Sequence, residues 1–431
     1  RGVKVTAGWL IPGLGVKRWV VILLAGVTLL ALGLAFAVLD VYRTAPNTWW
    51  LPVLSALSLR FLQRWMRVVI YAGLGLGLVI FGIWGLNRAL LRPFVRPGKP
   101  VLDAVSAYRK RERGARVVAI GGGTGLSSLL RGLKEYTNNI TAIVTVADDG
   151  GSSGELRRNM GILPPGDLRN CLAALSDDET LITQLFQYRF ASGVGLNGHS
   201  LGNLLITALA DITGSFEDAI VESGHVLAIR GQVMPSTLHD VRLVADVRLD
   251  GVVKDIRIQG ESQIPKASGQ IQRVWLEPNT PSAYPPAIQA ILAADLIVVG
   301  PGSLYTSLLP NLLVPDLADA FRASRAVKVF VCNVATQPGE TDGYTTGEHI
   351  KAIEKHVGGR IFDIVIANNH YMGKLNGTST FVKVEDNLDE EYTVCRANLT
   401  DGEFPWRHDS HKLAKSIMSF YEEKVNQLAS V

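Results

Sequence analysis

A glycine-rich turn is the stretch of this chain best suited to binding chemistry. Gly122, Gly123, Thr124 and Gly125 follow directly on an apolar, β-branched run at 117–120, and leucines then recur at helical spacing. This pattern predicts a strand, a turn and a helix. Such a turn points backbone N–H groups at a phosphate, and glycine lets the backbone approach the anion because it has no Cβ. We therefore expect a phosphate-binding turn; a purely structural turn is the alternative.

Two adjacent carboxylates, Asp148 and Asp149, stand at the end of a second apolar run, 140–146. They are followed by Gly-Gly-Ser-Ser-Gly, a composition that forms anion-binding loops. Neighbouring carboxylates at a strand end are suited to holding a divalent cation beside a phosphate, and they also suit a ribose hydroxyl. A simple turn or helix cap would use the same residue types.

A third polar group follows two consecutive prolines. It consists of Asp167, Arg169 and Asn170, at the start of a helical pattern. Asp167 can complete a cation site with the earlier aspartates, and Arg169 can donate charged hydrogen bonds to a phosphate. The alternative for Asp167 is a helix N-cap.

The segment NGHSLGN contributes Asn197, His199 and Asn203 at the start of an apolar helical pattern. Amides and an imidazole at a helix start can contact a ligand. A single histidine is more often structural, but this one stands between glycines and asparagines at a helix start, which makes the group a candidate for ligand binding.

A second glycine turn follows the buried apolar run 296–300. Gly302 and Ser303 precede a further helical pattern and offer a second anion site. Asn333 ends the next run, 327–333, and should border the same crevice, because the carboxyl ends of parallel strands meet at one edge of a sheet. Two such loops suit a nucleotide diphosphate better than a mononucleotide.

The elements that must position these residues alternate between strand and helix across 116–431. This alternation predicts an α/β fold with a mostly parallel, Rossmann-like sheet. Between 226 and 276, short apolar runs follow one another without helical segments, which predicts a β-rich insertion that is at least partly antiparallel. Near the end of the chain, Leu413, Ile417 and Phe420 predict an amphipathic helix for packing or for a dimer contact.

The N-terminal part of the chain is different in character. Two apolar runs, 19–39 and 68–86, are each long enough to cross a hydrocarbon core of about 30 Å. We expect residues 1–100 to be a membrane anchor with two transmembrane helices; a signal peptide is the alternative for the first run. Residues 101–115 form a basic linker. By the positive-inside rule the domain 116–431 then lies in the cytoplasm, at the inner membrane.

Charge and cysteine content exclude some other classes. The net charge is only +4, and the basic run at 109–113 is explained better by contact with anionic lipid than with nucleic acid. The three cysteines, Cys171, Cys332 and Cys395, are isolated, so we expect a reducing compartment and no disulfide.

Taken together, these motifs resemble the CofD-like superfamily, and within it the YvcK branch of gluconeogenesis-factor-like proteins. The segments that carry the resemblance lie in the expected order between Arg116 and Asn369: IGGGTGLSSLLRGLK, VTVADDGGSSGELR, PPGDLRNCLAALS, NGHSLGNLLI, GPGSLYTSLLPNLL and CNVATQPGETDGYT. The two apolar runs lie outside the shared domain and resemble a membrane-anchored variant.

The resemblance implies a Rossmann-like homodimer that binds a nucleotide above the parallel strands. Proteins of the CofD branch transfer phosphoenolpyruvyl or phospholactyl groups from a guanosine diphosphate donor to a deazaflavin. They use a divalent cation such as Mg²⁺, for which Asp148, Asp149 and Asp167 would be the ligands here. The YvcK branch instead binds UDP-N-acetylglucosamine and influences cell shape, wall-precursor synthesis and carbon use, with no established chemistry and no organic cofactor.

Two functions follow from this resemblance. The first is a UDP-sugar sensor that acts through a regulatory protein partner, with the glycine turns at the phosphates and the NGHSLGN group around the sugar or base. The second is a Mg²⁺-dependent transferase. Few aromatic residues stand near the glycine turns to hold a flat deazaflavin, the nearest being Tyr305 and Tyr344. This scarcity and the expected membrane location favour the sensor.

Overall fold

The computed structural model describes residues 111–429, apart from 177–180, 250, 252–253 and 268, and a few positions before residue 82. The chain divides into two units, Arg1–Arg109 and Lys110–Val431. The predicted spans 19–39 and 68–86 fall for the most part outside the described residues. Among the positions that are described, no helix is long and apolar enough to cross a membrane, so they give the expected anchor no support.

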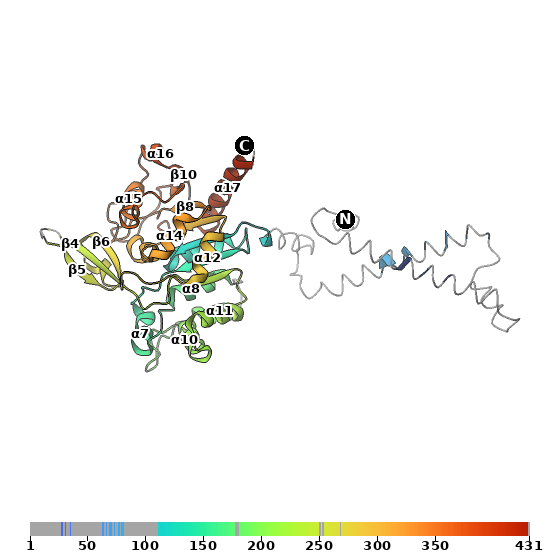
Figure 1. Cartoon of the computed structure of the whole chain (residues 1–431), viewed down its shortest axis with the longest axis horizontal. Helices are drawn as coiled ribbons and strands as arrows, with labels where there is room; N and C mark the ends of the chain where they lie inside the picture. The colour runs from blue at the N-terminus through green and yellow to red at the C-terminus, as the bar shows by residue number, and fades with distance from the viewer. Residues whose placement is uncertain are drawn as a thin grey trace. The chain divides into compact units, whose positions relative to one another are not determined.

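The second unit is built on a seven-stranded parallel sheet with the order β10-β9-β8-β7-β1-β2-β3 (Figure 1). Since β1 lies between β2 and β7, the strand order reverses between β1 and β7. In open α/β sheets a ligand binds at such a reversal, beyond the carboxyl ends of the strands. The strands are β1 (Val117–Gly121), β2 (Ile140–Val144), β3 (Gln232–Pro235), β7 (Leu296–Val299), β8 (Val327–Val331), β9 (Ile364–Asn368) and β10 (Thr393–Ala397).

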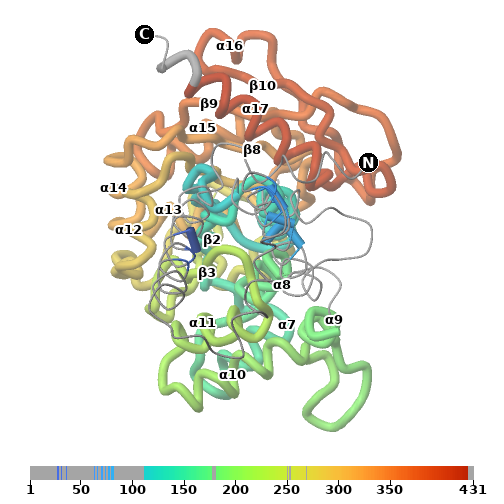
Figure 2. Tube along the Cα trace, turned by 90° about the vertical axis from the view of Figure 1, so that its right-hand side faces the viewer, coloured from blue at the N-terminus to red at the C-terminus, as the bar shows by residue number. Residues whose placement is uncertain are grey.

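Helices cover both faces of this sheet, which is why β1, β7 and β9 are buried at every position. Their sequences are apolar throughout, apart from Asn368 at the end of β9. Figure 2 shows α12, α13 and α14 together on one side of the tube trace. The helices on one face are α6 (Gly123–Leu133), α8 (Gly166–Leu175), α11 (Phe216–Val226) and α17 (Ser410–Ala429); those on the other are α12 (Pro285–Ala293), α13 (Leu309–Leu312), α14 (Pro315–Ala323) and α15 (Thr346–Val357).

Helix α6 shows how the first turn is held in place. Leu126, Leu129, Leu130 and Leu133 are fully buried against the sheet, α8 and α17. Replacing one such leucine by alanine typically costs about 2–5 kcal/mol of stability. The leucine stripe therefore fixes the helix, and with it the glycine turn at its start.

The remaining described helices are short or lie at the periphery. They are α7 (Gly151–Met160), α9 (Leu181–Gln187), α10 (Leu201–Thr213), the π-helical turn η4 (Leu304–Leu308) and α16 (Leu388–Glu391). Figure 1 places α7 and α10 together at the end of the unit opposite β10 and α16.

The β-rich insertion forms a separate three-stranded antiparallel sheet that projects from the unit (Figure 1). Its strands are β4 (Arg242–Leu249), β5 (Ile256–Gln259) and β6 (Gly269–Glu277), with a 3-10 turn, η3 (Ile264–Ala267). One part of the expected insertion belongs elsewhere: β3 pairs with β2 in the main sheet. The residue that ends β3 is Pro235, which cannot donate to a ladder and is tolerated because β3 is an edge strand.

The expected class, an α/β fold with a mostly parallel sheet and a β-rich insertion, is thus confirmed. Strand β10 was not expected. Its residues are only partly buried and include Arg396 and Cys395, so the segment lacks the continuous apolar signal of the inner strands.

Candidate functional site

The two glycine turns lie in direct contact beyond the carboxyl ends of β1 and β7. A Cβ on Gly125 would lie 2.5 Å from the carbonyl oxygen of Pro301, and one on Gly302 would lie 3.5 Å from that of Gly122. The Asn311 side chain joins the two turns by donating from Nδ2 to the carbonyl oxygens of Gly121 (2.9 Å) and Ser307 (2.8 Å). The absence of side chains at these glycines is what permits the close approach.

The first turn also touches Asp167, at the start of α8. A Cβ on Gly122 would lie 2.6 Å from Asp167 Oδ2, and the Asp167 carboxylate accepts a hydrogen bond from the Gly123 N–H. Burial, and then the nearby charge of Asp148, raises the pKa of Asp167 to about 6. Gly123 has a φ of +64°, which favours glycine, and Thr124 is exposed beside it. The predicted residues of this turn and Asp167 therefore form one group.

The second turn is held by side chains from the loop after β8. Asn333 accepts from the Gly302 N–H through Oδ1 (3.1 Å) and donates to the Gly302 carbonyl oxygen through Nδ2 (2.8 Å). Gln337 donates from Nε2 to Ser303 Oγ (2.7 Å). Asn333 was predicted to contact the ligand, but its amide is used to fix the turn. We therefore describe Asn333 as a positioning residue.

Glu340 is a residue of this site that the sequence did not single out. The residue is 8% exposed, and its carboxylate lies at the start of η4, where it accepts from the Tyr305 N–H (3.3 Å) and from Thr306 Oγ1 (3.0 Å). Burial raises the pKa of Glu340 to about 7. The place where an anion would meet the start of η4 is therefore filled by a carboxyl group of the chain itself.

The adjacent aspartates Asp148 and Asp149 are directed to different partners. Asp148 Oδ1 accepts from the Gly150 N–H (2.8 Å), and a Cβ on Gly166 would lie 3.3 Å from Asp148 Oδ2. Asp149 Oδ1 instead accepts from the Ser262 N–H (2.9 Å) in the insertion. Asp148 is thus close enough to Asp167 for its charge to act on that carboxylate, whereas Asp149 binds the insertion through Ser262.

Glu261, beside Ser262, adds an acidic group that sequence reasoning also missed. Burial raises its pKa to about 8, and the negative charges of Asp148 and Asp167 act in the same direction. Burial likewise raises the pKa of Asp148. The sequence places Glu261 within the insertion, but it does not indicate that folding brings Glu261 close to Asp148 and Asp167. Within the part of the chain that the structure describes, no group of three or more His, Cys, Asp or Glu side chains could hold a metal ion.

The NGHSLGN segment brings two of its three candidate residues into the site. His199 and Asn203 are 5% and 2% exposed, and both contact Ser152 in the first turn of α7. The Asn203 side chain donates from Nδ2 to Ser152 Oγ (3.1 Å). Asn197 lies on an exposed turn outside this buried group. Ser152 was not a candidate residue, although the sequence placed it in the glycine-serine loop.

Arg169 and Asn170 lie next to one another on α8. Arg169 Nη2 donates to Asn170 Oδ1 (2.8 Å), while Arg169 Nε is buried without a hydrogen-bond partner. Burial, and then the charge of Arg189, lowers the pKa of Arg169. A buried guanidinium with a free donor is suited to an anionic ligand.

Comparison with known proteins assigns this arrangement to a family. A family model described as 2-phospho-L-lactate transferase CofD matches residues 117–423. The chain belongs to the CofD family. A putative gluconeogenesis factor of Nostoc sp. is 47% identical over 434 residues, a match that covers 96% of this chain and 92% of the relative. The gluconeogenesis factor of Bacillus subtilis is 44% identical over 317 residues, a match that covers 72% of this chain and 98% of the relative.

A solved structure shows the same fold for a related protein. The crystal structure of a UPF0052-family protein from Bacillus halodurans matches this CofD-family chain with a TM-score of 0.66 and 44% identity, covering 71% of this chain and 99% of the solved one. The expected superfamily and its gluconeogenesis-factor members are thereby confirmed.

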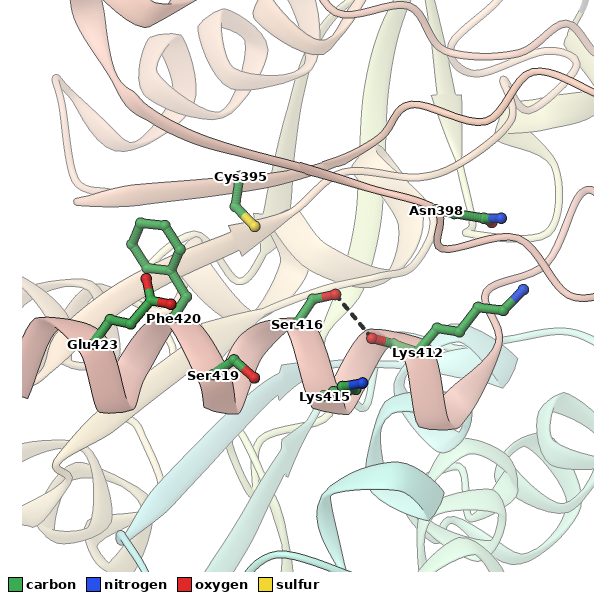
Figure 3. A pocket seen from close by; sticks show the side chains of 8 residues that line it. All are labelled: Cys395, Asn398, Lys412, Lys415, Ser416, Ser419, Phe420 and Glu423. Carbon is green, nitrogen blue, oxygen red and sulfur yellow. Dashed lines mark hydrogen bonds between the residues drawn. The ribbon is translucent and has the colours of Figure 1, made fainter.

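The CofD-family domain also has a hollow of about 460 Å³ between β10 and α17 (Figure 3). None of its lining residues belongs to the two glycine turns or to the side chains that contact them. In Figure 3 the Cys395 thiol and the Asn398 side chain lie across from α17, and Ser416 donates to the Lys412 carbonyl oxygen. Lys412 Nζ is bound to the Thr400 carbonyl oxygen (2.8 Å). We therefore place the candidate site at the glycine turns and not at this hollow.

Proposed function

We propose that the two glycine turns together bind a nucleotide-diphosphate sugar and that the protein acts as a sensor of this ligand. The observation that carries the proposal is the pairing of the turns. Each donates a backbone N–H to a carboxylate, Asp167 in the first case and Glu340 in the second. Backbone N–H groups that bind carboxylate oxygens can also bind phosphate oxygens, and at the start of η4 a ligand phosphate would take the place of Glu340.

The buried polar groups beside the turns support a ligand with a polar sugar. Asn203 Oδ1 and Arg169 Nε are both buried without a hydrogen-bond partner. An unpaired buried polar group costs stability, so such groups are commonly completed by a ligand. We take the ligand to be UDP-N-acetylglucosamine, whose hydroxyl, amide and phosphate groups supply both donors and acceptors.

The proposed role is regulation of cell shape, wall-precursor synthesis and carbon metabolism through a protein partner. The relatives called gluconeogenesis factors support the connection to carbon metabolism. We also propose that residues 1–100 anchor the protein to the cytoplasmic face of the inner membrane. The match to the Nostoc relative, which covers 96% of this chain, extends into that segment, whereas the match to the Bacillus subtilis relative covers 72%.

A CofD-type transferase is the second candidate, and the proximity of Asp148 to Asp167 favours it. Mg²⁺ is often held by one or two carboxylates together with substrate phosphates. Asp148 and Asp167 fit that pattern, while Asp149 is occupied by the Ser262 N–H. A bound cation would neutralise charge on a diphosphate leaving group. In that case Asp167 would be essential for transfer.

Calorimetric titration tests the two candidates. UDP-N-acetylglucosamine, UDP and GDP are each added to the purified protein with and without Mg²⁺, and the mixtures are then analysed for products. The sensor predicts UDP-sugar binding without transfer of a group to an acceptor. A preference for the guanosine nucleotide that is strengthened by Mg²⁺ would contradict it. Asp167→Ala sharpens the test, because it should abolish any transfer but only weaken UDP-sugar binding.

A further inference from the structure

We infer that Ser152 is a nucleophile, activated by His199 and Glu155, that attacks a phosphoanhydride. The Ser152 hydroxyl lies 2.9 Å from His199 Nδ1, and His199 Nε2 lies 3.3 Å from Glu155 Oε2. A hydroxyl, an imidazole and a carboxylate in hydrogen-bonded sequence form the arrangement that activates serine nucleophiles on unrelated folds.

The direction of the hydrogen bonds agrees with this role. Asn203 Nδ2 donates to Ser152 Oγ (3.1 Å), which leaves the hydroxyl proton of Ser152 to point at His199 Nδ1. Glu155 lies next to Nε2 of His199 and favours the neutral imidazole tautomer that has its hydrogen on Nε2. In that tautomer Nδ1 has a free lone pair and can take the proton from Ser152.

The surroundings of Ser152 suit a reaction at phosphorus. Ser152 is 7% exposed and lies in the first turn of α7, a helix that begins without a capping side chain. No side chain caps the N–H groups of that turn, so these donors and the positive end of the helix can stabilise oxygen atoms that gain negative charge. Asn203 Oδ1, buried and unpartnered beside Ser152, is a second indication that a ligand completes this site.

Other buried histidines of the domain hydrogen-bond to the backbone, as expected of a structural role. His349 and His356 each direct Nδ1 to a backbone carbonyl oxygen of their own helix, at 2.7 Å in both cases. His408 directs Nε2 to the Cys332 carbonyl oxygen (3.1 Å). His199 instead joins a serine to a glutamate through both ring nitrogens. A contact that only tied α7 to the NGHSLGN segment would not need the carboxylate.

The reaction proceeds in two balanced steps, and only the identity of its substrate rests on the proposed function. Ser152 Oγ attacks the phosphorus that carries the sugar, forming an Oγ–P bond as the bridging P–O bond breaks. The Ser152 proton passes to His199 Nδ1 and then to the leaving nucleoside monophosphate. Water next attacks the same phosphorus, loses a proton to His199 and releases the sugar phosphate. That proton returns to Ser152.

A fluorophosphonate probe tests the nucleophile without any nucleotide. Attack by Ser152 forms an Oγ–P bond and expels fluoride, and the adduct is located by mass spectrometry of peptides from the full-length protein. We expect labelling at Ser152 that is absent in Ser152→Ala. His199→Gln should slow labelling by about 100-fold or more, the usual contribution of a general base. Glu155→Gln should slow it by up to about 10⁴-fold, the cost of replacing the carboxylate of a serine triad by an amide, because the tautomer is no longer fixed.

The chain offers a matched control for these variants. His225 and Glu222 form an exposed pair, with Nδ1 3.4 Å from Oε2, that has no serine attached. His225→Gln and Glu222→Gln should label at the wild-type rate. Glu155 is half exposed, so Glu155→Gln keeps the test valid even if His199→Gln does not fold.

The inference is overturned if Ser152 is not labelled, or if folded Glu155→Gln is labelled as fast as the wild type. Calorimetry separates this failure from that of the proposed function. Labelling of Ser152 in a protein that does not bind a UDP-sugar would leave the nucleophile standing and remove the sensor.

Discussion

The turn after β1 and the turn after β7 each donate a backbone N–H to a carboxylate, but they are built differently. In the first, three consecutive glycines allow Asp167 to approach, and a Cβ on Gly122 would lie 2.6 Å from its Oδ2. In the second, Asn333 binds both the N–H and the carbonyl oxygen of Gly302, and Glu340 fills the start of η4. The first turn requires glycine, which has no side chain. The second turn requires hydrogen bonds from side chains of a loop that is distant in the sequence.

This difference explains how visible each turn is to a reader of the sequence. Glycines that permit a close approach appear as glycines in one short run. The side chains that hold the second turn come from a loop more than 30 residues away, so only the fold reveals them. Substitutions should therefore disturb the first turn by added bulk and the second by lost hydrogen bonds.

The largest effect is expected where the two turns touch. Gly125→Ala would place a Cβ 2.5 Å from the Pro301 carbonyl oxygen, a backbone atom that cannot move without shifting the second turn. We expect it to lower the free energy of unfolding by about 3 kcal/mol and to abolish ligand binding. Chemical denaturation and calorimetry measure the two effects.

Gly402→Ala is the control for this bulk effect, because a Cβ there would meet nothing within 4 Å. It should leave both quantities unchanged. If Gly125→Ala behaved like Gly402→Ala, the contact between the turns would not be required for binding.

The next effect is a pH dependence at the second turn. Glu340 has a pKa of about 7 in the folded chain, raised by burial from 4.5. Between these values the folded state keeps the proton and the unfolded state has lost it. The unfolded state thus binds fewer protons, and the free energy of unfolding falls as pH rises from 4.5 to 7, by about 3 kcal/mol from this group.

Glu340→Gln removes that contribution, so its stability should fall less steeply over the same range. Denaturation midpoints measured at several pH values for both proteins provide the test. Asp167→Asn makes the comparison sharper. The pKa of Asp167 is about 6, raised from 3.8, so the contribution of Asp167 to the free energy of unfolding should be lost between pH 3.8 and 6, a lower range than for Glu340. Identical profiles for the wild type and Glu340→Gln would show that this carboxyl is not buried as described.

A smaller loss is expected from Asn333→Ala, which releases both hydrogen bonds to Gly302. Because the freed backbone groups are only partly buried, we expect a cost of about 1–2 kcal/mol and weaker ligand binding. Asn369→Ala, at an exposed position beyond β9, is the control and should change neither. Equal effects of the two variants would argue that the second turn needs no clamp.

The smallest effect is expected from Ser303→Ala, which removes only the acceptor for Gln337 Nε2. A single partly buried hydrogen bond contributes about 1 kcal/mol. Ser128→Ala, whose hydroxyl bonds to the Thr124 carbonyl oxygen on an exposed helix face, serves as the comparison and should cost less. A loss of 3 kcal/mol or more for Ser303→Ala, measured by thermal unfolding, would mean that Ser303 has a larger role than this bond.

Much of the main sheet could be predicted from the sequence because its inner strands are buried on both faces. β1 and β7 are continuous apolar runs, and β2, β8 and β9 are apolar except for one residue each, Thr141, Lys328 and Asn368. The edge strands were harder: β3 was assigned to the insertion, and β10 was not expected. An edge strand is packed on fewer sides, so its sequence is under weaker constraint and its apolar signal is shorter.

The candidate site was predictable only where its chemistry lies within one short segment. The glycine turns, Asp148 and Asp167 were found in this way. Glu261 and Glu340 were missed because nothing local marks a glutamate that folding will bury beside other carboxylates. Conversely, Asp148 and Asp149 are neighbours in sequence but have separate partners, since the insertion captures Asp149.

Hydrogen–deuterium exchange with and without UDP-N-acetylglucosamine tests the central claim most directly, namely that both turns bind one ligand. The account predicts that amides in 121–125 and in 302–307 gain protection together, with the same dependence on ligand concentration. Protection confined to one turn, or found only in segments outside both turns, would contradict it.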